Sequence, residues 1–79
     1  MIDLTKSKDA VRVLENACKP GVNPRGTWIA YAEGDYAALV GATPIGAKAR
    51  ELERQGRVHL FQKRIQDEPR RYVYFAVTK

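Results

Sequence analysis

The sequence predicts a single α+β domain, residues 1–79, in which three helices precede a C-terminal two-stranded β-hairpin. Three observations lead to this prediction. Apolar residues first recur at helical spacing, then two segments with capping and glycine signals indicate a pair of helices, and the last part of the chain has strand composition on both sides of a charged turn. With 79 residues, the chain is close to the lower limit for one self-supporting core.

The first helix is predicted from an apolar stripe near the N-terminus. Its residues follow the i, i+3, i+4, i+7, i+8 spacing that lies on one helical face. Thr5 or Ser7 can cap the start, and the motif KPG at residues 19–21 supplies a cation, a breaker and a flexible residue at the end. The stripe consists of Ala10, Val13, Leu14, Ala17 and Cys18.

The next segment, residues 22–34, has the least regular pattern. Asn23–Gly26 predicts a turn. Thr27–Tyr31 is rich in β-branched and aromatic residues, which favours a short strand over the alternative, the first turns of a helix capped by Thr27. After this segment, GDYAALVG at residues 34–41 predicts a short second helix that ends at Gly41.

The third helix, residues 43–55, has the clearest boundaries. Thr43 is a good N-cap, Pro44 suits the first helical position, and the helix ends at Gly56. Because so short a turn separates it from the second helix, the two form a helix-turn-helix pair. At about 100° per residue, Ile45, Ala49 and Leu52 face the core. The opposite side carries Gly46, Ala47, Arg50 and Arg54, with Thr43 and Pro44 at the leading edge and Lys48 on a flank.

This outward side suits a DNA groove. Its small residues let the helix backbone approach a partner, and the arginine side chains can reach a base edge or a phosphate. The alternative is a solvated face with intrahelical ion pairs such as Arg50–Glu53.

The hairpin, residues 57–77, is predicted from strand composition on both sides of QDEP, and its charge is basic. The net charge of the chain is +5, and residues 48–79 contain 9 of the 14 basic residues but only 4 of the 9 acidic ones. Such a one-sided positive field attracts polyanions. The alternative is an ordinary charged edge that prevents aggregation. The basic residues that flank the tip are Lys63, Arg64, Arg70 and Arg71.

The stretch DYAALVGATPIGAKARELERQGRV at residues 35–58, followed by a hairpin, resembles the winged helix-turn-helix of bacterial and phage DNA-binding regulators. Two features match. A helix of small residues ends in glycine, and the following helix ends in the common pattern "leucine, three polar, glycine, any, hydrophobic", which starts here at Leu52 and leads into the wing. Two features depart from the pattern: residues 22–34 are longer than the usual connection, and the third helix has few amide side chains. The resemblance places Thr43, Pro44, Gly46, Ala47 and Arg50 where such proteins contact the major groove, and makes residues 63–71 the wing.

The function predicted from these observations is sequence-specific or semi-specific binding of double-stranded DNA in transcription regulation, with helix 43–55 in the major groove and hairpin 57–77 on the backbone. One alternative is an RNA-binding domain, against which the lack of a paired aromatic stacking platform counts. Another is a protein-interaction module that uses the aromatic residues near Trp28. A homodimer or a protein partner would supplement the weak binding of a lone unit. The predicted DNA contacts are Thr43, Pro44, Gly46, Ala47, Lys48, Arg50, Arg54, Lys63, Arg64, Arg70 and Arg71.

The sequence gives no sign of an enzyme, a cofactor or a metal site. Cys18 and His59 fall in separate elements, without ligand spacing or a neighbouring base, and no glycine-rich phosphate loop is present. Trp28, Tyr31 and Tyr36 are interpreted as core or rim aromatics, with a dimer contact as the alternative. A single cysteine, the absence of a signal peptide and the absence of a long apolar run predict a cytoplasmic protein without membrane partners.

Overall fold

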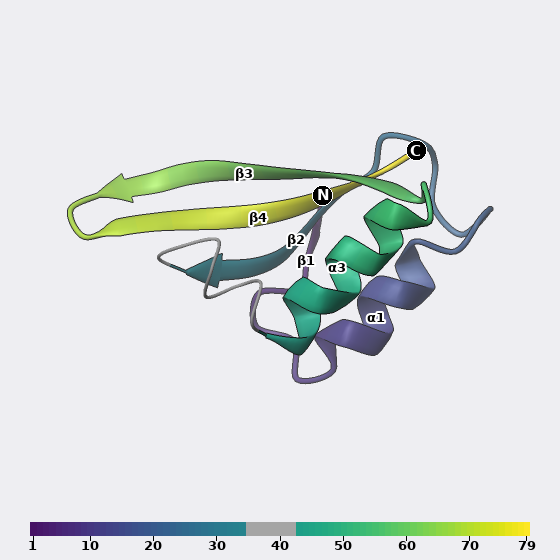
Figure 1. Ribbon diagram of the computed structural model, residues 1–79, viewed down its shortest axis with the longest axis horizontal. Helices are drawn as coiled ribbons and strands as arrows, with labels where there is room; N and C mark the ends of the chain where they lie inside the picture. The colour runs from purple at the N-terminus through teal and green to yellow at the C-terminus, as the bar shows by residue number, and fades with distance from the viewer. Residues whose placement is uncertain (35–42) are drawn as a thin grey trace.

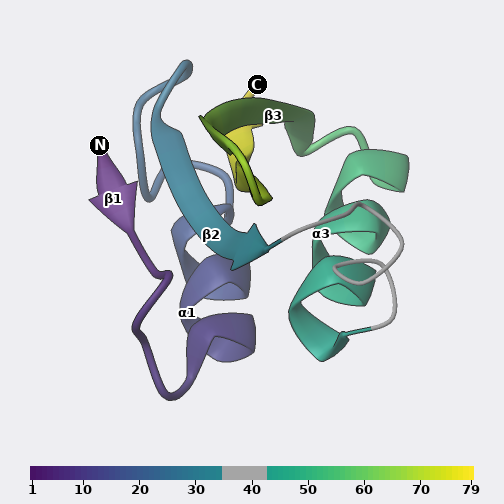
Figure 2. The ribbon, with the colours of Figure 1, turned by 90° about the vertical axis from the view of Figure 1, so that its left-hand side faces the viewer.

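The computed structural model describes residues 1–34 and 43–79. In these ranges its four strands form one mixed sheet in the order β1-β2-β4-β3, with β1 parallel to β2 and the other pairs antiparallel. Both helices pack on the same face of this sheet (Figure 2). The elements are β1 (Ile2–Asp3), α1 (Ala10–Ala17), β2 (Trp28–Gly34), α3 (Pro44–Arg54), β3 (Val58–Asp67) and β4 (Arg70–Thr78).

The predicted three-helix winged helix-turn-helix with a two-stranded wing is wrong, although the class is α+β. The described residues contain two helices, and β4 pairs with β2 as well as with β3, so the hairpin belongs to a four-stranded sheet. The predicted strand Thr27–Tyr31 is confirmed but continues to Gly34. Its longer row of backbone N–H and C=O groups needs partners, and β4 supplies them. The predicted helix at residues 34–41 lies, from residue 35 onward, outside the described residues.

The first predicted helix is confirmed as α1, but its start differs. The N-cap is Asp9, whose side chain makes no capping hydrogen bond, whereas Ser7 Oγ accepts a hydrogen bond from Asp9 N at 3.4 Å. Along the stripe, Leu14 and Cys18 are buried, but Val13 is 38% exposed. The core face of α1 is therefore narrower than the sequence pattern predicts.

The core lies between the two helices and the sheet. Leu14 of α1, Leu52 of α3, Ile29 of β2 and Val58 of β3 are its fully buried large side chains among the described residues. Gly34, the last residue of β2, pairs with Tyr72, so β3 and β4 continue beyond the sheet without β2 beside them. The result is a hairpin that projects from one end of the molecule (Figure 1).

Candidate nucleic-acid interface

The outward face of α3 is fixed by the helix start and by the residues that the helix buries. Thr43 Oγ1 accepts a hydrogen bond from Gly46 N at 3.1 Å, and Pro44 occupies the first helical position, which confirms the predicted start. Ala49 and Leu52 are buried against the core, as predicted. The exposed residues of the opposite side are Pro44, Ala47, Arg50 and Arg54, and Glu53 is exposed on a flank.

Gly46 does not belong to this outward face. It is buried, so its predicted place opposite Ala49 and Leu52 is wrong. At about 100° per residue it lies about 60° from Ala49, at the margin of the core face. The part of the helix that can approach a partner closely therefore begins at Pro44 and Ala47 rather than at Gly46.

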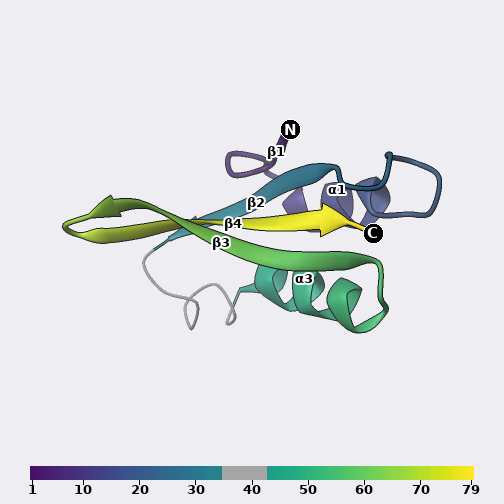
Figure 3. The same cartoon turned by 90° about the horizontal axis from the view of Figure 1, so that it is seen from above.

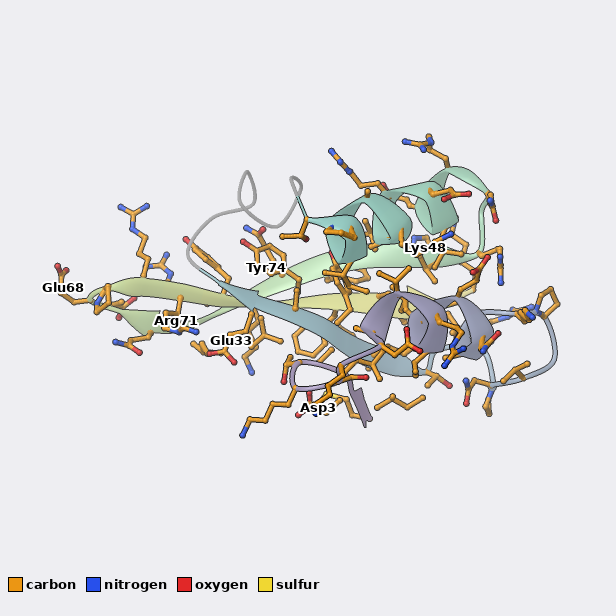
Figure 4. The ribbon with its side chains drawn as sticks, turned by 90° about the horizontal axis from the view of Figure 1, so that it is seen from below. Asp3, Glu33, Lys48, Glu68, Arg71 and Tyr74 are labelled. Atoms are coloured by element: carbon orange, nitrogen blue, oxygen red, sulfur yellow. The ribbon has the colours of Figure 1, made fainter. Side chains whose placement is uncertain are left out.

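Lys48 lies between the two helices rather than on the outward face (Figure 4). Its Nζ is 3.3 Å from Glu51 Oε2 and 3.7 Å from Glu15 Oε1 of α1, and only 19% of its side chain is exposed. Because two carboxylates already neutralise this ammonium, the geometry argues against the predicted phosphate contact. Lys48 instead connects α3 to α1.

The four basic residues of the hairpin are divided between the two faces of the sheet. Side chains alternate between faces along a strand, and cross-strand partners share a face. Tyr72 packs on the core, so its partner Arg64 and the preceding alternate residue Arg70 lie on the helix side. By the same alternation, Lys63 and Arg71 lie on the other side. We call this side, opposite α1 and α3, the open face.

Arg64 and Arg71 each form an ion pair with a carboxylate. On the helix side, Arg64 Nη1 is 2.9 Å from Asp67 Oδ1. On the open face, Arg71 Nη2 is 2.9 Å from Glu33 Oε1 of β2 (Figure 4). These pairs are exposed enough for solvent to screen them, so each contributes at most about 1 kcal/mol and can exchange for a phosphate.

Arg57 has a structural role that the sequence did not reveal. Its Nε donates to Cys18 O at 3.1 Å and its Nη2 to Glu15 O at 3.3 Å, so it binds the carbonyl end of α1. A cation is favoured there by the helix dipole as well as by the unpaired carbonyls. In the sequence, Arg57 is only a basic residue after the glycine that ends the third helix. Its role could not be predicted, because the contact joins residues far apart in the chain.

The open face carries an aromatic cluster, which we define as Trp28, His59, Phe61 and Phe75. The rings of Trp28 and Phe61 are stacked, with centroids 5.5 Å apart and an interplanar angle of 28°. Phe75 meets Trp28 edge-on at 5.2 Å, and His59 lies 6.3 Å from Phe61. The stacked rings of Trp28 and Phe61 remove the argument from a missing aromatic platform. Of the core and rim positions that the sequence allowed for Trp28, the structure gives the rim, because Trp28 is 45% exposed.

Metal binding and cysteine chemistry have little support in the described parts of the chain. No group of three or more His, Cys, Asp or Glu residues among them could hold a metal ion. Cys18 is buried, and burial raises the pKa of its thiol despite the opposing charge of Arg57, which makes the thiolate scarce. The helices among these residues are too short to cross a bilayer.

Comparison with protein-family models, curated proteins and solved structures finds no match for this chain.

Proposed function

We propose that the protein binds double-stranded DNA as a regulator of transcription, with α3 in the major groove and the β3–β4 hairpin along the phosphate backbone. One observation carries this proposal. Arg50 and Arg54 are exposed on the outward side of α3, and Arg64 and Arg70 lie on the helix side of the projecting hairpin. Helix and hairpin thus contribute arginines to the same side of the sheet.

The small residues on α3 support a close approach to DNA. Pro44 and Ala47 precede Arg50 on the exposed side, so little side-chain bulk separates the first turns of the helix from a groove. An arginine that reaches guanine O6 and N7 with both arms discriminates against other bases by about 1–3 kcal/mol. The exposed carboxylate of Glu53 repels phosphates, which limits how closely its side of α3 can approach the DNA backbone. Arg50 is therefore assigned to base edges, and Arg54, in the last turn, to the backbone.

The hairpin arginines provide the first test. We expect Arg70→Ala to weaken binding to any duplex and to lower the slope of log affinity against log salt by about one unit, because one phosphate contact is lost. The matched controls Lys63→Ala and Lys48→Ala also remove one positive charge each, but from the open face and from the helix interface. Affinity measured across a salt series should separate them from Arg70→Ala. Equal slopes for all three variants would contradict the proposed orientation of the hairpin.

Arg50 provides the second test. We expect Arg50→Ala to lower affinity for a duplex selected from a random pool by about tenfold more than affinity for an unselected duplex, since only the selected site offers the matching base edge. Arg54→Ala should lower both affinities alike. If no duplex is enriched from the pool and no duplex binds at physiological salt, double-stranded DNA binding is refuted.

A further inference from the structure

Neither of the described helices, α1 and α3, lies over the open face of the sheet. Seen from above, the strands lie nearest to the viewer and both helices lie beyond them (Figure 3). Trp28 comes from β2 and Phe61 from β3, yet their rings meet over the intervening strand β4. On this face Val77 and Ala30 are only 9% and 3% exposed, whereas Trp28 and Phe61 remain 45% and 49% exposed.

The size of this surface limits what can bind it. An aromatic side chain offers roughly 150–250 Å² when fully buried, so two half-exposed rings present about 200 Å² together. A stable protein interface buries about 800 Å² on each partner, several times more. One or two stacked bases need far less area, because each base contributes through one ring face. The cluster therefore fits a nucleobase better than it fits a second copy of the chain.

The charge beside the cluster suits a phosphate backbone. Lys63 lies two residues after Phe61 on β3, on the same face. Arg71 follows along this face, paired with Glu33. The other carboxylate that the strand register places here is Asp3 of β1, across β2 from β4, and it accepts hydrogen bonds from Thr5 N and Oγ1. A single-stranded DNA that passes from the rings toward the hairpin tip thus meets the cations Lys63 and Arg71, while Asp3 lies on β1 at the other edge of the sheet.

We propose that the open face is a binding site for single-stranded DNA, in which bases stack on Trp28 and Phe61 while Lys63 contacts the phosphate that follows. Beside Lys63, this face carries Val73, which is apolar and partly exposed. Val73 suits a thymine methyl and a deoxyribose, whereas a ribose 2′-hydroxyl placed against it would lose its water without gaining a partner.

This site is independent of the proposed duplex interface. It uses the opposite face of the sheet, and none of its residues belongs to α3 or to the helix side of the hairpin. Each proposal can fail without the other: Arg54→Ala should weaken duplex binding and leave single-strand binding unchanged, and Phe61→Leu should do the reverse.

Trp28 makes the experiment direct, because it is the only tryptophan in the chain. We expect an oligothymidine of about eight nucleotides to quench the fluorescence of Trp28 saturably, since bases that stack on an indole quench it. Phe61→Leu keeps an apolar side chain but loses the ring, and it should weaken this binding about tenfold. Lys63→Ala should weaken it severalfold and reduce its salt dependence. Val22→Ala, at another exposed apolar residue, is the matched control and should bind like the wild type.

Three results would overturn the proposal. One is unchanged affinity in both Phe61→Leu and Lys63→Ala; Lys63→Ala decides the matter if Phe61→Leu does not fold. Another is tighter binding of an oligouridine of the same length, which would assign the face to RNA. The third is a change in Trp28 fluorescence on concentrating the protein without DNA, together with a doubled mass in sedimentation, which would assign the face to a second copy.

Discussion

Leu52→Ala is expected to lower the free energy of unfolding by about 3 kcal/mol, because it leaves a cavity where α3 meets the core. Leu52 is 1% exposed and belongs to the same buried cluster as Leu14, Ile29 and Val58. A domain of 79 residues has a total stability of only about 4–12 kcal/mol, so this loss is a large share of it. Urea unfolding followed by circular dichroism measures the change.

The control for Leu52→Ala is the removal of an aliphatic side chain from the surface. Val22 is 56% exposed, and Val22→Ala should change the free energy of unfolding by less than about 0.5 kcal/mol. A loss below about 1 kcal/mol for Leu52→Ala would mean that α3 is not anchored to the core as described. The outward side of α3 would then lack the fixed position that duplex recognition needs.

Local signals predicted the parts of the fold that depend on neighbouring residues. Thr43 and Pro44 fix the start of α3 through a hydrogen bond and a backbone angle within the same turn, so their positions in the sequence were sufficient. The stripe through Leu14 and Cys18 predicted α1 for the same reason. The strands on either side of the hairpin tip also pair with their nearest neighbour in sequence.

Contacts between distant segments could not be predicted in this way. The pairing of β2 with β4 depends on which strand offers a free edge after the chain has folded back, and no local pattern encodes that choice. Gly46 carries no side chain, so its burial leaves no hydrophobic signal in the sequence. Lys48 appears as one more cation on a charged helix until α1 brings Glu15 beside it.

In the candidate site, too, the local features could be predicted from the sequence and the contacts between distant segments could not. Ala47, Arg50 and Arg54 lie on the exposed side of α3 as their spacing predicted. The basic residues of the hairpin were predicted as one group, yet the register divides them between two faces. The stacking of Trp28 on Phe61 requires the strand order β2-β4-β3, so the sequence alone could not show that these two rings meet.

Tyr31 should make the protein less stable at high pH. Burial, together with the nearby Tyr74 and Glu53, raises the pKa of Tyr31 to about 12, although Arg50 opposes this shift. In the unfolded chain a tyrosine ionises near pH 10. The folded state therefore holds this proton more tightly, and its contribution to stability is complete below about pH 10 and is lost as the pH rises toward about 12. At about pH 11.5 the loss from Tyr31 alone should be about 2 kcal/mol.

The variant Tyr31→Phe isolates this effect, because phenylalanine keeps the buried ring but has no hydroxyl to ionise. Other tyrosines and the lysines titrate in the same pH range, so the informative quantity is the difference between wild type and variant at each pH. Urea unfolding at about pH 9 and about pH 11.5 should show the wild type losing about 2 kcal/mol more than Tyr31→Phe between the two conditions. Equal losses for both proteins would show that the Tyr31 hydroxyl already reaches solvent in the folded state. Such a result would be at odds with a side chain that is 5% exposed and lies near the charges of Arg50 and Glu53.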